Sequence, residues 1–547
     1  MASAGVYLKH NIVAEPLFNQ WHAWSYLIPP ASAAMFTANS HVKMMRSFLS
    51  APEVHVATLK NPAMMGGSFI NHPVSKAPEI KQLLERTIDE CASLLELAEA
   101  IKTLDTMVQA QATGTSLEPL YRDVPAPLRG YVELVYDINN HPAVRFIEGL
   151  LYRSRFYRPD LQSIALFADN GDRPFAFNTP KLRDEQILHL RIPFASTELD
   201  ELFKTKYTPR PFDELKEILR VSDKDERLLS SFFTTEAEPV GARYEGSGVR
   251  VRYFGHACVL IESRNVNVLV DPVISYKCDG GIARYTCADL PDTIDYVLIT
   301  HNHHDHCMLE SLLQLRHKIR TIVVPKSYGG SLTDPSLKLM LQQIGFRDVR
   351  ELDELETIEV DGGYIFLLPF LGEHCDLNIR TKGAYLIKLE NRSILCVADS
   401  NNLEPQLYEH VHELLGDVDV MFVGMECDGA PLSWVYGPLL TKPLPRKMDQ
   451  SRRFDGSNCE KGLNLVKSLN PQQVYVYAMG QEPWLTFLTA IQYTDESRPI
   501  VESNRLVKEC LGRGRTSERL FGCKEVLLEP VSASAKAKHR AAIQSGG

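Results

Sequence analysis

No run in this sequence comes close to the ~20 consecutive apolar residues that a membrane-spanning helix needs. The first ten residues carry no basic segment followed by an apolar one, so no secretory signal peptide is predicted. None of the eleven cysteines forms a C-x-x-C pair, and zinc-ribbon spacing is absent. These absences favour a cytoplasmic protein whose cysteines are mostly reduced core residues.

The sequence also lacks an excess of positive charge. Its 59 lysines and arginines face 69 aspartates and glutamates, which gives a net charge of −10. Such a balance argues against a phosphate-binding surface, so neither nucleic acid nor a membrane is an expected partner. With 44% hydrophobic and 23% charged residues over 547 positions, the composition is that of a globular chain with about two to four domains.

The pattern of apolar residues changes in a polar, turn-rich segment at 234–248, which predicts a linker. Before it, residues 78–110 have helical spacing, residues 117–157 are predicted to be largely helical, and residues 1–75 to be irregular with short strands. After it, short apolar runs alternate with turns, and helices are expected at 309–316 and 336–344. We therefore predict three parts: an α+β N-terminal domain (1–245), an α/β domain (246–530) and a flexible polar tail (531–547).

The densest group of polar side chains follows a short apolar segment, in the sequence LITHNHHDHC. Residues two apart on an extended loop point the same way, so His301 and His303 are expected to share one metal ion. Asp305 and His306 would then face a second metal ion close to the first. His304 falls outside this H-x-H-x-D-H pattern and is predicted to support the site or to face solvent.

This motif after a strand, in an alternating β/α pattern, resembles the metallo-β-lactamase fold, an αββα sandwich. The segments FGHAC (254–258) and VDP (270–272) are similar to the opening strands of that fold. The resemblance implies that Asp271 hydrogen-bonds a ligand histidine. Asp399, which follows the apolar run in CVADS, matches the aspartate that bridges the two metals in this family.

The chain departs at two places from the dizinc hydrolases of this fold. Their third histidine falls here on LGEHCD, where Glu373 aligns and His374 is its neighbour. Their last histidine should follow the apolar segment QQVYVYAMG, but the sequence continues with QEPW. Two later histidines, His410 and His412, are predicted to lie on a solvated helix face.

The site assembled in this way has three histidines and three carboxylates: His301, His303, His306, Asp305, Glu373 and Asp399. Hydrolytic zinc pairs prefer nitrogen-rich ligation, whereas mixed carboxylate and imidazole ligation suits iron or manganese. Three carboxylates also offset three of the four positive charges on two divalent ions, which lowers the cost of oxidising them. Di-iron carboxylate proteins use ligands of this mixed kind.

The pattern resembles the di-iron β-hydroxylases of nonribosomal peptide pathways such as chloramphenicol biosynthesis, which have a separate N-terminal domain and a glutamate in place of the third histidine. The resemblance implies that one iron is held by His301, His303 and Glu373, that the other is held by Asp305 and His306, and that Asp399 bridges them. Three carboxylates are the expected catalytic groups: Glu373, Asp399 and Glu426. Glu426 is expected either as an acid beside the site or, equally, as a surface acid.

The activity implied by this resemblance is an oxygen-dependent hydroxylation of the β-carbon of an aminoacyl group tethered to a carrier domain. The expectation includes two oxo- or hydroxo-bridged irons, dioxygen, an external electron donor and a homodimer. A dimetal hydrolase of an ester, lactone or phosphodiester is the alternative, because GHACVLIE resembles lactonases and phospholipases. A non-catalytic scaffold is a third hypothesis, against which six intact ligands argue. The WHAW segment (21–24) is expected to be core or, alternatively, the wall of an aromatic substrate pocket.

Overall fold

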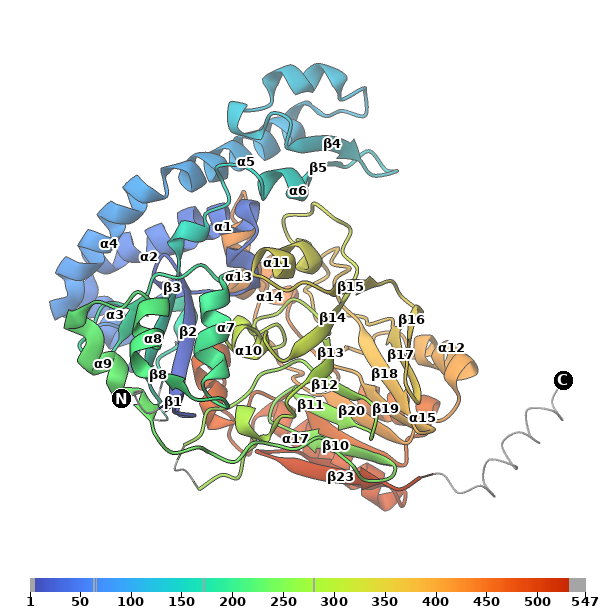
Figure 1. Cartoon of the computed structure of the whole chain (residues 1–547). Coiled ribbons are helices and arrows are strands. Elements are labelled where there is room, and N and C mark those ends of the chain that lie inside the picture. The colour runs from blue at the N-terminus through green and yellow to red at the C-terminus, as the bar shows by residue number, and fades with distance from the viewer. Residues whose placement is uncertain are drawn as a thin grey trace.

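The computed structural model describes residues 5–530 except 62, 63, 65, 170, 172, 279 and 280, so the tail predicted at 531–547 lies outside the described residues. Two seven-stranded sheets dominate the second half of the chain (Figure 1). The first has the order β15-β14-β13-β12-β11-β10-β23 and the second the order β16-β17-β18-β19-β20-β21-β22. Both sheets mix parallel and antiparallel pairs.

The strands of these sheets are short and rich in β-branched residues, as expected for strands buried on both faces. Those of the first sheet are β10 (Val249–Tyr253), β11 (Val259–Glu262), β12 (Asn267–Val270), β13 (Ile294–Leu298), β14 (Ile319–Pro325), β15 (Val349–Leu352) and β23 (Lys524–Leu528). Those of the second are β16 (Thr357–Val360), β17 (Gly363–Leu368), β18 (Ala384–Leu389), β19 (Arg392–Cys396), β20 (Val420–Gly424), β21 (Gln473–Tyr477) and β22 (Thr516–Arg519).

Helices cover the outer faces of the two sheets and complete the predicted αββα sandwich. An apolar cluster between the sheets joins residues of both, among them Val259 and Phe422. The first sheet packs against α10 (Leu309–Leu315) and α11 (Leu337–Gln343), both close to their predicted bounds. The second packs against α12 (Gln406–Leu415), α15 (Cys459–Leu469) and α17 (Arg498–Gly512).

The N-terminal half is α+β, as predicted, and shares a hydrophobic core with the second half. Its four-stranded sheet consists of β2 (Ile12–Phe18), β3 (Trp21–His22), β6 (Gln162–Ala168) and β7 (Leu188–Leu190). Its main helices are α1 (Pro30–Phe36), α2 (Val42–Ser50), α3 (Pro52–Thr58), α4 (Ala77–Glu90) and α5 (Ala92–Gln111). One core cluster contains both Leu199 of the first half and Leu312 of α10, so the halves pack as one body.

Two local predictions for the N-terminal half are wrong. Residues 117–157 form a β-hairpin of β4 (Val132–Tyr136) and β5 (Pro142–Phe146), and their one α-helix is α6 (Glu148–Leu151). The alternate burial along β4 gives the period of a strand, and the turn at 137–140 closes the hairpin. Residues 1–75 contain α1 to α3, of which α1 is buried on every side and therefore shows no amphipathic period.

The candidate ligands lie where strands end at one edge of the sandwich. The metal-binding loop follows β13, and Asp271 follows the parallel neighbour β12. Glu373 follows β17 and Asp399 follows β19, two strands that run in the same direction because both are antiparallel to β18. The carboxyl ends of these strands therefore bring residues that are distant in sequence to one place.

Candidate metal centre

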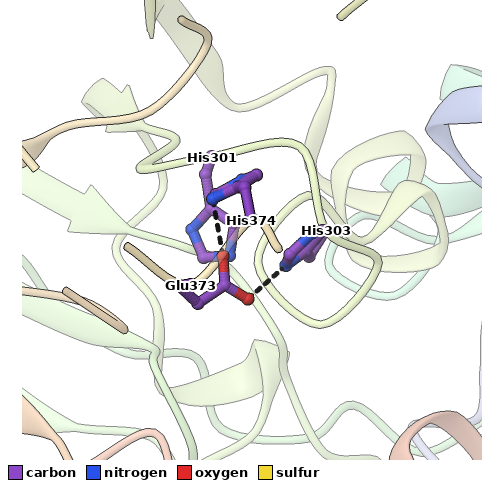
Figure 2. A group of neighbouring side chains, drawn as sticks. All are labelled: His301, His303, Glu373 and His374. Carbon is purple, nitrogen blue, oxygen red and sulfur yellow. Dashed lines mark ion pairs between the residues drawn. The ribbon is translucent and has the colours of Figure 1, made fainter. Parts of the chain in front are cut away.

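The first group of ligand candidates surrounds the carboxylate of Glu373. Its Oε1 lies 2.8 Å from Nδ1 of His303, and its Oε2 lies 2.7 Å from Nδ1 of His374 (Figure 2). With His301, these side chains place four ligand atoms within 4.8 Å of one another. Burial opposes ionisation of Glu373, but the two imidazoles hold its pKa well below the ordinary value. The structure thus brings Glu373 together with both predicted histidines, and also with His374.

The second and third groups lie beside the first. His306 and Asp399 share a group with His301, in which Nε2 of His306 is 3.1 Å from Oδ2 of Asp399. His306 also belongs to a group with Asp305 and His256, in which Nε2 of His256 is 3.3 Å from Oδ2 of Asp305. All six predicted ligands are therefore neighbours, although they come from three separate stretches of the chain.

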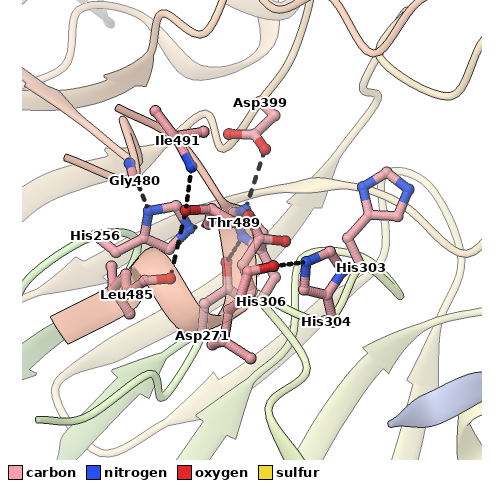
Figure 3. A network of polar contacts seen from close by, with 12 residues as sticks. His256, Asp271, His303, His304, His306, Asp399, Gly480, Leu485, Thr489 and Ile491 are labelled. Atoms are coloured by element: carbon pink, nitrogen blue, oxygen red, sulfur yellow. Dashed lines mark hydrogen bonds and ion pairs between the residues drawn. The ribbon is translucent and has the colours of Figure 1, made fainter. Parts of the chain in front are cut away.

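Hydrogen bonds to buried partners fix which imidazole nitrogens carry hydrogen. Nδ1 of His306 lies 2.8 Å from a carboxylate oxygen of Asp271, which can only accept, so Nδ1 donates (Figure 3). Asp271 thus makes the expected hydrogen bond to a candidate ligand histidine. Nε2 faces Asp399 at 3.1 Å and is the nitrogen that can bind a metal ion once it loses its hydrogen. Thr300 donates its hydroxyl hydrogen to Asp271 at 2.6 Å, so its oxygen accepts from Nδ1 of His301 at 3.0 Å. Nε2 of His301 is then left with a lone pair.

The charges of this cluster show where cations fit. Burial opposes protonation of His306, but Asp399 and Asp271 raise its pKa well above the ordinary value, so a metal ion would displace that proton. Besides Oε2 of Glu373, which faces His374, two buried ligand atoms have no hydrogen-bond partner within the described part of the chain: Nε2 of His301 and Oδ1 of Asp399. Each such atom costs about 1–3 kcal/mol unless something binds it. These converging lone pairs fit a pair of metal ions.

A cavity of about 350 Å³ opens directly onto the ligands. It is lined by His303, Asp305, Glu373 and Asp399, and by Glu426 just beyond β20. Burial, with Asp428 and Asp399 nearby, raises the pKa of Glu426 to about 8. The structure therefore places Glu426 beside the candidate ligands, as an acid that keeps its proton at neutral pH.

The structure adds residues that the sequence did not single out. Nε2 of His303 lies 3.0 Å from the hydroxyl oxygen of Tyr436, which leaves Nδ1 to face Glu373. His304 is buried and donates from Nε2 to the backbone oxygen of Leu488 at 3.0 Å, so its predicted alternative of facing solvent is wrong. His256 lies in the segment FGHAC (254–258), which resembles an opening strand of the fold, but no feature of the sequence indicated that its imidazole would lie among the candidate ligands. The side chains of His410 and His412 on α12 are exposed, as predicted.

A second, smaller cavity of about 100 Å³ lies behind His304. Trp21, His22 and Trp24 line it with Phe177 and Trp434, and His304 and Trp434 also line the metal cavity. The side chains of Trp21, His22 and Trp24 are buried, as predicted for core residues, and they also face this cavity. A role in an aromatic substrate pocket stays a prediction. Ser25 adds a direct link to the metal loop by donating to the backbone oxygen of Asn302 at 3.0 Å.

Two predictions that concern the whole chain can also be compared with the structure. All eleven cysteines are free, and nine of them are buried, as expected for core residues. No helix within the described part of the chain is long and apolar enough to span a bilayer.

Comparison with known proteins gives matches along nearly the whole chain. Residues 7–237 match the family described as the diiron non-heme beta-hydroxylase N-terminal domain, and residues 250–432 match a beta-lactamase superfamily domain. The 4-amino-L-phenylalanyl-[CmlP-peptidyl-carrier-protein] 3-hydroxylase of Streptomyces venezuelae is 41% identical over 523 residues, which cover 94% of this chain and 98% of that protein.

Solved structures agree with the sequence relatives. The crystal structure of CmlA, a diiron beta-hydroxylase from Streptomyces venezuelae, superposes with a TM-score of 0.90 at 39% identity, over 96% of this chain and all of that one. A metal-dependent hydrolase of Methanopyrus kandleri is 30% identical over 124 residues, but these cover only 22% of this chain and 46% of the hydrolase. The sequence match to this hydrolase is therefore much shorter than the match to the β-hydroxylase.

Proposed function

The chain belongs to the family of diiron non-haem β-hydroxylases, and from this premise we propose that it hydroxylates the β-carbon of an aminoacyl group carried by a nonribosomal peptide synthetase. The aminoacyl group would be a thioester on the carrier domain. Three carboxylates among six ligand candidates around one cavity carry the proposal. A relative whose name specifies an aminoacyl carrier protein as its substrate supports the tethered form.

Nε2 of His301, Nδ1 of His303 and the carboxylate of Glu373 would hold one iron, and Nδ1 of His303, which faces Glu373 at 2.8 Å, would lose its hydrogen on binding. We assign the other iron to Asp305 and His306, with Asp399 between the two. The contacts of Nδ1 with Thr300 and Asp271 support this assignment, because they make Nε2 the nitrogen of His301 and of His306 that can bind metal. When bound, the iron pair supplies the reducing power that activates dioxygen for attack on a C–H bond.

The protein's own groups would orient the substrate and hold protons. The cavity of about 350 Å³ is within the usual range for small-ligand sites, and Trp434, Phe454 and Ile491 give it an apolar wall. An apolar amino-acid side chain would lie against that wall with its β-carbon toward the ligands. Glu426, whose Oε2 has no partner among the described residues, would hold a proton there until the reaction requires it.

The N-terminal domain is proposed to form one wall of the substrate channel. Trp24 and Phe177 from this domain pack against His304 of the metal loop, with ring centroids 5.8 and 4.6 Å apart respectively. A substitution of Trp24 or Phe177 would therefore alter the packing of His304 and, through the backbone, the positions of His303 and Asp305. Docking of the carrier domain, electrons from an external donor, a homodimer and a cytoplasmic location remain predictions.

The dimetal hydrolase is the weaker hypothesis. The segment in which hydrolases of this fold have their last histidine has none here and contains Glu482, which is buried and accepts from the backbone N–H of His256 at 3.2 Å. Glu482 therefore stabilises a neighbouring loop. The partial similarity to hydrolases reflects the shared fold, and fold alone does not determine the reaction.

The test is a reaction with carrier domains that bear different aminoacyl thioesters. Protein loaded anaerobically with ferrous iron is mixed with each carrier, a chemical reductant and dioxygen, and the intact mass of the carrier is measured. We expect a gain of one oxygen atom on a carrier-bound substrate and none on the free amino acid. His410→Ala, on the exposed face of α12, is the matched control and should retain the activity. Hydrolysis of the thioester without hydroxylation by the iron-loaded protein would contradict the proposal.

A further inference from the structure

His256 and His374 are the two members of the three ligand groups whose roles the proposed function leaves open, and His256 is the one that faces Asp305. We propose that His256 is a positioning residue, which donates from Nε2 to the carboxylate of Asp305 and does not bind iron itself. The proposal rests on the proposed function, because it takes Asp305 to be an iron ligand.

The segment that follows β21 holds His256 at three points. The backbone N–H of Ala478 donates to the carbonyl of His256 at 2.9 Å, and the backbone N–H of His256 donates to Oε1 of Glu482 at 3.2 Å. The backbone N–H of Gly480 donates to Nδ1 of the imidazole at 3.1 Å (Figure 3). These bonds hold His256 at a φ of 50°, a left-handed conformation that costs a non-glycine residue about 1–3 kcal/mol. Backbone strain of this kind is common where a functional side chain is held in a fixed orientation.

The hydrogen bond from Gly480 to Nδ1 determines whether Nε2 of His256 carries a hydrogen. A backbone N–H can only donate, so Nδ1 of His256 must supply the lone pair. In a neutral imidazole the hydrogen then sits on Nε2, and a nitrogen that carries hydrogen cannot bind a metal ion. His256 is therefore unsuited to be a ligand through Nε2, although that atom lies among the ligands.

His306 shows the opposite arrangement within the same cluster. Its Nδ1 donates to the carboxylate of Asp271, which only accepts, so Nε2, which faces Asp399 at 3.1 Å, is the nitrogen that can bind a metal ion. The rings of His256 and His306 pack with their centroids 5.3 Å apart, so the two tautomers are set side by side by different partners. The partner of Nδ1 therefore determines whether Nε2 of each imidazole can bind metal, as in His306, or donates a hydrogen bond, as in His256.

The hydrogen on Nε2 points to one acceptor. Oδ2 of Asp305 lies 3.3 Å away, a contact that does not meet hydrogen-bond geometry in this structure, and Nε2 has no hydrogen-bond partner among the described residues. This distance is slightly longer than an ideal hydrogen bond, as is common for functional contacts before the site is loaded. With one oxygen of Asp305 engaged by His256, the carboxylate is oriented for the iron that it shares with His306.

Two substitutions separate the two nitrogens of His256. His256→Gln keeps a donor at the position of Nε2 and loses the acceptor for Gly480, whereas His256→Asn keeps the acceptor and loses the donor. Each protein is loaded with ferrous iron anaerobically and dialysed against a chelator, and the iron per chain is measured. Thermal unfolding of the metal-free proteins serves as the folding control.

We expect the wild type and His256→Gln to retain about two irons per chain. His256→Asn should lose one iron first, because removal of such a supporting bond lowers metal affinity by about 10–100-fold. Iron binding by His256→Asn equal to that of the wild type would overturn the proposal.

Equal loss of iron in both variants, with folding retained, would instead make His256 a ligand. If His256→Asn does not fold, the iron content of His256→Gln still distinguishes the two roles. A ligand role predicts that His256→Gln loses iron, whereas a positioning role predicts that it retains iron. A wild type that binds no iron would refute the proposed function itself, which makes the two failures distinguishable.

Discussion

Substitution of Asp271 by asparagine changes one buried atom that sets the tautomer of His306. Asp271 is fully buried, and its Oδ2 accepts from Nδ1 of His306 at 2.8 Å and from the hydroxyl of Thr300 at 2.6 Å. In Asp271→Asn, an amide NH₂ at that place donates to Nδ1. The hydrogen of His306 then moves to Nε2, the nitrogen that faces Asp399. The variant has nearly the same shape but removes a metal-binding lone pair.

The expected magnitude follows from the loss of one oriented ligand. Changes behind a ligand histidine lower metal affinity by about 10–100-fold, or about 1.4–2.7 kcal/mol. The metal-free fold should suffer little, because burial already raises the pKa of the Asp271 carboxyl and so disfavours its charge. Competition with a chelator measures the iron affinity, and thermal unfolding without metal measures the fold. Unchanged iron affinity in a folded Asp271→Asn variant would refute the tautomer reasoning.

Three further predictions concern the carboxylates at the cavity. Glu373→Gln should lower the iron content whereas His374→Gln should leave it near that of the wild type, and metal analysis showing equal loss in both would contradict the choice of Glu373. Glu373→His should abolish hydroxylation of the carrier-bound substrate, so retained product in the mass assay would disprove the role of that carboxylate. The unfolding midpoint of the metal-free protein should fall as pH rises from about 5 to about 8. Burial raises the pKa of Glu426 to about 8 in the folded protein, against 4.5 when it is unfolded, so the folded state binds more protons over this range and loses stability as they are removed. Glu426→Gln should remove that part of the pH dependence, and a profile identical to that of the wild type would show that Glu426 does not cause it.

The sandwich and its metal loop could be predicted because their signals are local. His301 to His306 lie within one short loop after a strand, and the strand runs alternate with turns in a regular way. The hairpin β4–β5 was missed because its apolar residues, spaced along a segment with several prolines, also suit a helix. Helix α1 was missed because burial on every side removes the period that marks an amphipathic helix.

The chemistry of individual imidazoles could not be predicted, because it depends on distant partners. His256 receives its hydrogen bond from Gly480, 224 positions away, and His306 donates to Asp271, 35 positions away. Tyr436 reaches His303 from 133 positions away. A motif shows which residues can bind a metal, whereas the three-dimensional contacts show which nitrogen of each ring is available.

The most direct test is a crystal structure of the anaerobically prepared ferrous protein with anomalous scattering measured at the iron edge. We expect two peaks per chain. The first should lie among His301 Nε2, His303 Nδ1 and Glu373, and the second among Asp305, His306 Nε2 and Asp399, with Nε2 of His256 beyond bonding distance. Peaks at other side chains, or a second iron bonded to His256, would contradict the assignment.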